Sequence, residues 1–186
     1  MLRRELGLVT AARVVASIAL AQARGEPFEG LGPPADRREE LTRRQLGPAT
    51  LLLRALRRHV SVGRAERLAH AAIELGGMAF LGSLLGDLDP AAIGDVTAEI
   101  RERLGRFFNA EGEVEVGEDA AAYTVHRCLF VELAPKVGAA ALMPAFCAVD
   151  ETYFHSALTP LRLSRTETLA GGATRCDFQF RWDDAR

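Results

Sequence analysis

The sequence predicts an α+β fold, in which an N-terminal layer of about four helices packs on a small antiparallel sheet with one inserted helix. Apolar residues recur at helical spacing through most of the first 109 residues. From Glu113 onward the period changes to two, and it returns to two near the C-terminus. Because 186 residues suit one domain, we expect a helical half, 1–109, and a strand-helix-strand half, 110–186, to share one core.

The first helix is expected over residues 6–24, where apolar side chains repeat every three to four residues up to a glycine. The glycines and prolines of residues 25–36 then indicate a loop. A second helix follows at 37–60. Gly47-Pro48 should break or kink it, because proline cannot donate a backbone hydrogen bond.

Two further helices complete the first half. Residues 65–85 are apolar on most sides in their second part, which predicts a buried central helix. Asp89-Pro90 suits the N-cap and first turn of a fourth helix that extends to about Phe108.

The second half is expected to begin with a hairpin. Its strands are a segment near Val114 and Val116 and the run 122–131, joined by a turn at 117–119. Helical spacing over 135–154 predicts the inserted helix.

Two antiparallel strands should close the chain. They cover residues 158–169 and 174–182, and Gly171-Gly172 joins them.

Charge and hydropathy indicate which kinds of partner and which location to expect. A formal net charge of −2 gives no general attraction to nucleic acid, so we expect no nucleic-acid partner. The thiol chemistry considered below calls for a small-molecule substrate. We expect no membrane span, which needs ~18 uncharged apolar residues. Arg13 interrupts the apolar N-terminal run, which argues against a secretory signal. We therefore expect a cytoplasmic protein, and a homodimer is possible through the apolar faces of the helices.

All three cysteines lie in the last third of the chain, at Cys128, Cys147 and Cys176. In a reducing compartment an odd number favours free thiols, catalytic groups or metal ligands over a disulfide framework. Zinc sites usually contain a close cysteine pair, and the sequence has none. We expect no metal and no cofactor. The alternative is that the cysteines are simply buried apolar residues.

Two of the cysteines should lie beside polar partners. In the strand 122–131, alternation puts His126 and Cys128 on one face and Arg127 on the other. On the inserted helix, Cys147 and Asp150 are three residues apart and share one surface. A thiol next to a carboxylate is a candidate pair of nucleophile and proton-transfer group.

The last two strands should direct two more residues inward. Cys176 alternates in step with two phenylalanines and the tryptophan, an apolar set that faces the core. Arg165 follows two inward leucines at period two, and an inward arginine needs an anion. The candidate anions are Glu167, Asp150, Asp177 and the carboxylate of a bound ligand.

Four motifs form an ordered set in the second half: Arg127-Cys128, Pro144-x-x-Cys147-x-x-Asp150, Leu161-x-Leu163-x-Arg165-Thr166-x-Thr168, and Arg175-Cys176-Asp177-Phe178-x-Phe180 after Gly171 or Gly172. This set resembles the L-2-amino-thiazoline-4-carboxylic acid hydrolase family. The resemblance covers about residues 65–182 and is strong after Tyr123. The closing strand is also similar to that of 4-vinyl reductase-type ligand-binding domains.

The resemblance implies hydrolytic opening of a cyclic amidine-like C=N bond, which gives an N-carbamoyl amino acid from a thiazoline. In this reaction Cys147 would attack the ring carbon and Asp150 would move a proton. Arg165 or Arg127 would hold the substrate carboxylate.

Other assignments of the same groups stay open. Cys128 with His126, or Cys176, could supply the nucleophile instead, and Asp150 could activate water directly. A thiol reacts at neutral pH only if its pKa is lowered.

Three functions remain as hypotheses: a cysteine-dependent hydrolase, a cyclase or lyase of specialised metabolism on the same scaffold, and a non-catalytic ligand-binding module. The enzymes predict at least one reactive thiol of low pKa. The binding module predicts inert cysteines and a larger, mostly apolar pocket.

Overall fold

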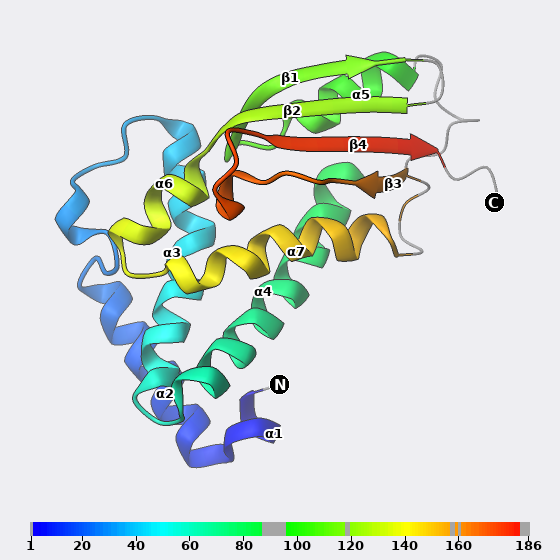
Figure 1. Ribbon diagram of the computed structural model, residues 1–186. Helices are drawn as coiled ribbons and strands as arrows, with labels where there is room; N and C mark the ends of the chain where they lie inside the picture. The colour runs from blue at the N-terminus through cyan, green and yellow to red at the C-terminus, as the bar shows by residue number, and fades with distance from the viewer. Residues whose placement is uncertain (1, 87–95, 118–119, 157–158, 160, 183–186) are drawn as a thin grey trace.

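The computed structural model describes residues 2–86, 96–117, 120–156, 159 and 161–182 and has the expected α+β architecture (Figure 1). In this part of the chain, the helices before the sheet are α1 (Leu2–Leu6), α2 (Leu8–Ala23), α3 (Arg37–Arg57), α4 (Val62–Leu85) and α5 (Val96–Gly105). The second half contains β1 (Ala110–Val116), β2 (Ala120–Cys128), α6 (Leu129–Lys136), α7 (Met143–Phe154), β3 (Leu161–Ser164) and β4 (Cys176–Trp182). Short 3-10 helices lie at Glu29–Leu31, Ala140–Leu142 and Leu169–Gly171.

The four strands form one antiparallel sheet in the order β1-β2-β4-β3. β1 with β2, and β3 with β4, are the two expected strand pairs. β3 is shorter than the expected 158–169, of which residues 157–158 and 160 lie outside the described chain. Its described end has a physical cause: the Asp177 carboxylate accepts the backbone N–H groups of Thr166 and Glu167, at 2.9 and 2.6 Å, which a longer strand would have paired.

Helix α3 continues through Pro48, so the helix does not break at this position. Packing on both sides explains the continuity. Leu46 and Leu51 are buried, and a Cβ at Gly47 would lie 3.2 Å from the ring of Phe28. Tertiary packing supplies most helical stability in proteins, and here it outweighs the hydrogen bond that proline removes.

Helix α4 begins slightly before its expected start and is only partly enclosed. Ala65 and Ala69 are buried, whereas Leu75 is 70% exposed, so the expectation of burial holds for one side of the helix. By length and composition α4 could cross a membrane, but a core helix of a soluble protein passes the same test. α4 packs against α3 and α7. The expected start of the fourth helix, Asp89-Pro90, lies outside the described residues, and its described part ends at Gly105.

Two helices, rather than the one expected, lie between β2 and β3. β2 ends at Cys128 instead of residue 131, and α6 begins at Leu129, whose N–H donates to the Asn109 carbonyl at 2.8 Å. α6 ends before Gly138. This residue has a φ of +66°, a backbone conformation that favours glycine. A short apolar run such as 129–131 fits a strand or a buried helical turn equally well by periodicity.

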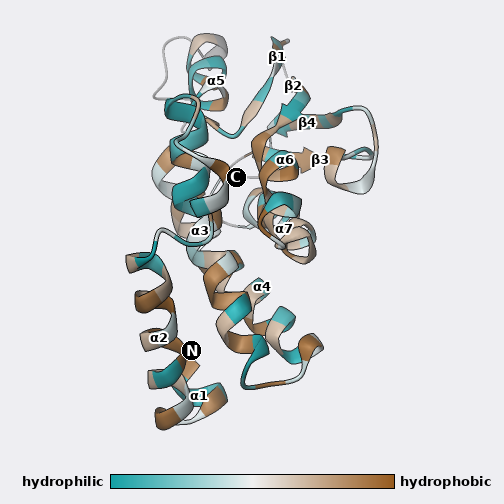
Figure 2. Cartoon of the chain, turned by 90° about the vertical axis from the view of Figure 1, so that its left-hand side faces the viewer, coloured by the Kyte–Doolittle hydropathy of each residue, from teal (hydrophilic) through white to brown (hydrophobic). Residues whose placement is uncertain are grey.

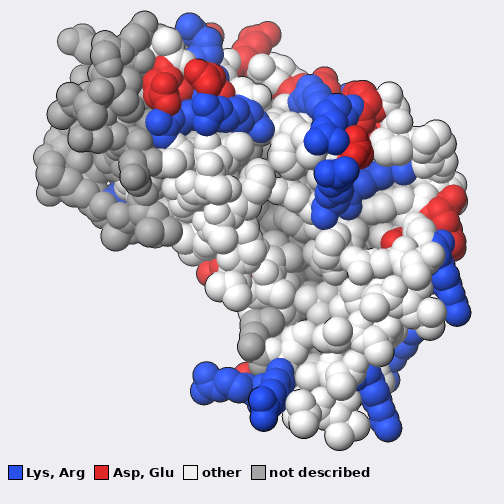
Figure 3. Space-filling view, turned by 180° about the vertical axis from the view of Figure 1, so that it is seen from behind, with Lys and Arg blue, Asp and Glu red and all other residues white. Residues whose placement is uncertain are grey.

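One connected core joins the two halves, from Val14 in α2 to Phe180 in β4. α7 packs against both α4 and β3, and α5 packs against β1. Figure 2 shows α3 and α5 on one side of the molecule and the sheet with α6 and α7 on the other. On the back of the molecule acidic and basic side chains lie next to each other (Figure 3). The ion pairs of the chain include Arg43 with Glu39 in α3.

Candidate functional site

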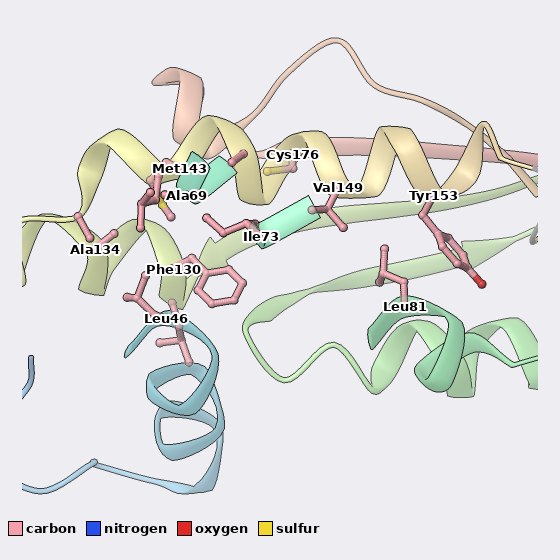
Figure 4. Packing of buried hydrophobic residues seen from close by; sticks show 14 of the residues in the cluster. Leu46, Ala69, Ile73, Leu81, Phe130, Ala134, Met143, Val149, Tyr153 and Cys176 are labelled. Atoms are coloured by element: carbon pink, nitrogen blue, oxygen red, sulfur yellow. The ribbon is translucent and has the colours of Figure 1, made fainter. Parts of the chain in front are cut away.

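A cavity of about 520 Å³ is lined by residues from α3, α4, β2, α6, α7 and β4. This volume is typical of ligand pockets, which span roughly 300–1,000 Å³. Most of the lining is apolar. The lining side chains labelled in Figure 4 include Ile73, Val149 and Cys176, which come from α4, α7 and β4. Its polar groups are few: Gln45, Asn109, Tyr123, Asp150, Arg165 and the thiols of Cys128, Cys147 and Cys176.

The fold brings all three cysteines to this one cavity, although they are far apart in the sequence. Cys128 ends β2, Cys147 lies in α7, and Cys176 begins β4. All three are free thiols. As expected, Cys176 lines the cavity together with Phe178 and Phe180, and its Sγ accepts the backbone N–H of Leu169 at 3.3 Å.

An irregularity in the β1–β2 hairpin decides which residues of β2 face the cavity. Arg127 pairs with Glu111 and Val125 pairs with Gly112, so His126 is an extra residue between two consecutive partners. Such a bulge shifts the alternation by one position. Tyr123 and Val125 face inward before it and Cys128 faces inward after it, while His126 is exposed. The predicted common face of His126 and Cys128 is therefore wrong, because that prediction assumed an unbroken alternation.

Arg165 is inward-facing, as the period of the sequence predicted, and its side chain is 3% exposed. Its Nη1 donates to Asp150 Oδ2 at 3.5 Å, and its Nη2 donates to Glu151 Oε1 at 2.9 Å and to the Cys147 carbonyl at 3.2 Å. The guanidinium also lies over the ring of Phe178, 5.0 Å from its centroid. The buried Nε has no hydrogen-bond partner within the described residues.

Of the anions predicted for Arg165, Asp150 is a partner and the other two protein carboxylates are not. Glu167 pairs with Arg175 at the surface, at 3.0 Å. Asp177 accepts from the backbone of Thr166 and Glu167. Glu151, the second carboxylate partner of Arg165, was not among the predicted anions.

Arg127 lies outside the cavity, like His126. Its guanidinium is paired with Glu132 at 2.6 Å and with Glu111 at 2.9 Å, and these hydrogen bonds are exposed. Neither Arg127 nor His126 lines the cavity. The structure thus brings together Cys128, Cys147, Asp150, Arg165 and Cys176 from the predicted site and leaves these two residues apart.

The thiols are poor nucleophiles in this environment. Burial raises the pKa of the Cys147 thiol to about 12, even though Arg165 lowers it. Burial also raises the pKa of the Cys128 and Cys176 thiols, against smaller lowering effects of nearby backbone N–H groups. At neutral pH all three are therefore protonated, whereas nucleophilic cysteines have a lowered pKa.

Asp150 has the opposite character. Burial raises the pKa of its carboxyl to about 7, although the positive charge of Arg165 favours the ionised form. Its side chain is 20% exposed. A carboxyl that is partly protonated and partly ionised at neutral pH can both accept and donate a proton.

Three polar residues of the lining were missed by the sequence analysis: Gln45, Asn109 and Tyr123. A hydrogen bond from the Asn109 side chain lowers the pKa of Cys128, and burial raises the pKa of Tyr123. Asn109 stands at the junction of the helical half and β1, and Tyr123 lies in a strand. Neither belongs to a motif that sequence spacing could have revealed. Among the described residues, no three His, Cys, Asp or Glu side chains form a group suited to a metal ion.

The fold and the site define an α+β protein with a ligand-sized, mostly apolar cavity and one titratable polar cluster. The profile of the L-2-amino-thiazoline-4-carboxylic acid hydrolase family matches residues 41–180, and the chain belongs to this family. Membership supports a hydrolase-like function on a related substrate at the level of the family. No curated protein matches the chain. Similarity to 4-vinyl reductase-type domains remains an expectation.

Proposed function

We propose that the protein adds water across the C=N bond of a heterocycle bound in the cavity and so opens the ring, with Asp150 as general acid and base. The observation that carries this proposal is the position of Asp150. It lines an apolar cavity beside Arg165, and its pKa is raised to about 7. A catalytic proton-transfer group works best when its pKa lies near the operating pH.

Water is the nucleophile in this proposal. Its oxygen bonds to the carbon of the C=N bond while Asp150 takes one of its protons. The electron pair of the π bond moves to the ring nitrogen, which takes the proton from Asp150. In a thiazoline the tetrahedral carbon then forms a C=O bond, the ring C–S bond breaks with its electron pair on sulfur, and the hydroxyl proton passes to sulfur. The product is the substrate plus one water, and Asp150 is restored.

Arg165 acts as a positioning residue for Asp150. The 3.5 Å contact between its Nη1 and the carboxylate fixes the direction of the carboxyl group, and its charge keeps the pKa of Asp150 from rising further. Glu151 and Phe178 in turn hold the guanidinium.

Cys147 is the alternative nucleophile. A thiolate would have to form against a pKa of about 12, which disfavours this route in the free protein. In the water route, Cys147, Cys128 and Cys176 shape the wall of the cavity and leave Asp150 desolvated.

A second candidate function is ligand binding without catalysis. It is favoured by the predominantly apolar lining of the cavity and by the raised pKa of all three thiols, which fit a pocket with inert cysteines.

Mass spectrometry can separate these functions, because ring opening adds the mass of one water. The substrates are 2-amino-thiazoline-4-carboxylic acid and 2-amino-thiazolines without the carboxylate. We expect Asp150→Asn to lose at least about 100-fold in rate, while Cys147→Ala stays active. Glu167→Gln, which changes an exposed carboxylate outside the cavity, is the matched control and should stay active. Loss of activity in Cys147→Ala with an active Asp150→Asn would establish the thiol route. Binding without turnover of any compound would establish the binding module.

A further inference from the structure

The polar end of the cavity has little capacity to hold a carboxylate. Arg165 is the one cation among the described residues that line the cavity. Its Nη atoms already donate to Asp150, Glu151 and the Cys147 carbonyl. The remaining Nε is buried and without a partner among the described residues, so Arg165 has no accessible pair of N–H groups free for the two oxygens of a carboxylate.

The charges around Asp150 also disfavour a bound carboxylate. When Asp150 is ionised, it and Glu151 supply two negative charges against the single positive charge of Arg165. The other titratable groups of the described lining are the three thiols and Tyr123, whose pKa values burial raises, so that they are neutral at pH 7. A further carboxylate here would meet repulsion in a poorly solvated site. A neutral or cationic N–C=N group would instead be attracted to Asp150.

The rest of the cavity is larger and less polar than an amino-acid heterocycle requires. Its apolar walls include Ala49 and Leu52 of α3, Ala72 and Phe80 of α4, and Phe130 of α6. A small thiazoline would fill a minor part of about 520 Å³. Apolar groups attached to it would be favoured in the remainder, by about fourfold in affinity for each buried methylene.

We infer that the substrate is a mostly apolar molecule with a neutral or cationic C=N or N–C=N head group and no carboxylate. The head lies at Asp150 and Arg165, and the apolar body occupies the part of the cavity lined by α3, α4 and α6. This inference rests on the proposed hydrolysis, and it names the substrate class of the same site.

Two matched compound series test the inference. The first consists of 2-amino-thiazoles, aromatic analogues that resist ring opening, with a carboxylate, methyl, propyl or hexyl group at position 4. Their Kd values are measured by calorimetry on the wild-type protein. We expect the hexyl compound to bind about 50-fold more tightly than the propyl compound, and the carboxylate to bind more weakly than the methyl compound. Tighter binding of the carboxylate than of the methyl compound would overturn the inference.

Two glycines of α4 provide a matched pair of variants. Among the described residues a Cβ at Gly76 or at Gly82 would meet nothing within 4 Å, but of the two only Gly76 lines the cavity. Gly76→Phe should weaken binding of the hexyl compound at least tenfold and leave the methyl compound unchanged, and Gly82→Phe should change neither. Ala72→Leu, also on the lining, is the second variant should Gly76→Phe not fold. Equal binding of the hexyl compound to wild type, Gly76→Phe and Ala72→Leu would contradict the assignment.

The second series, 2-amino-thiazolines with the same substituents, reports hydrolysis separately. If the alkyl thiazoles bind but no thiazoline is opened, the proposed hydrolysis is wrong. The inferred class of ligand, an apolar molecule without a carboxylate, is then still supported. If the carboxylate thiazoline is opened with the highest kcat/KM, the hydrolysis proposal stands and the inferred substrate class fails.

Discussion

The Arg165 guanidinium lies 3.5 Å from the Asp150 carboxylate at the edge of an apolar cavity, and the Arg165 side chain is almost fully buried. Two effects of opposite sign therefore act on the Asp150 pKa. Burial raises it and the positive charge of Arg165 lowers it, and burial prevails, so that the pKa reaches about 7. This balance makes the site sensitive to pH near neutrality.

The pH dependence of the rate follows from this value. As a general base, Asp150 works in its ionised form, so kcat/KM should rise about tenfold per pH unit below pH ~7 and level off above it. Since the pKa of Asp150 is raised, the acidic limb of the pH–rate profile should lie near neutrality instead of near pH 4. A pH–rate profile of the wild type checks this. An acidic limb at pH ~4 would show that an unperturbed carboxyl controls the reaction.

Replacement of Arg165 should move this limb upward. Arg165→Met removes the charge that favours ionised Asp150, so the pKa of Asp150 should rise by about one unit or more, and the acidic limb of the profile with it. Arg127→Met is the matched control, because Arg127 lies outside the cavity and should leave the limb unchanged. A purely structural role of Arg165 would lower the rate without shifting the limb.

All three thiols should react slowly with iodoacetamide at pH 8. A thiol with a pKa of about 12 carries so little thiolate that Cys147 should react at least about 100-fold more slowly than free cysteine. Peptide mass spectrometry after timed alkylation measures each thiol, and the same protein in denaturant gives the unprotected rates. One thiol with an apparent pKa well below ~8.5 would restore the cysteine as nucleophile.

The packing of α4 on α7 depends on Gly77. A Cβ at this position would lie 2.6 and 2.8 Å from the two methyl carbons of Val149, which is buried and β-branched. Gly77→Ala should cost about 1–3 kcal/mol in the free energy of unfolding. Gly82→Ala, on the same helix with open space around its Cβ, should stabilise by up to about 1 kcal/mol. Urea denaturation gives both values, and in a Val149→Ala background the cost of Gly77→Ala should fall, because only the 3.2 Å approach to the Cβ at position 149 remains.

The sequence was a good guide where a single element determines the geometry. The inward direction of Arg165, the residue after β3, followed from the period of two set by Leu161 and Leu163. The proximity of Cys147 to Asp150 followed from helical spacing. Prediction from the sequence failed where the geometry of a residue depends on a second segment of the chain. The exposure of His126 depends on how β2 pairs with β1, and the length of β3 depends on hydrogen bonds to Asp177. No local pattern contains that information.

The bulge that turns Cys128 inward should depend on Gly112. A Cβ there would lie 2.1 Å from the Thr124 carbonyl oxygen and 2.8 Å from the Val125 Cα, which are backbone atoms that can move only if β1 and β2 separate. Gly112→Ala should therefore destabilise the protein by about 3 kcal/mol or more. Gly117→Ala, in the same hairpin but 3.6 Å from its nearest neighbour, should change stability by less than about 1 kcal/mol. Thermal denaturation compares the two variants, and an equal loss in both would show that the bulge geometry is not what requires glycine at this position.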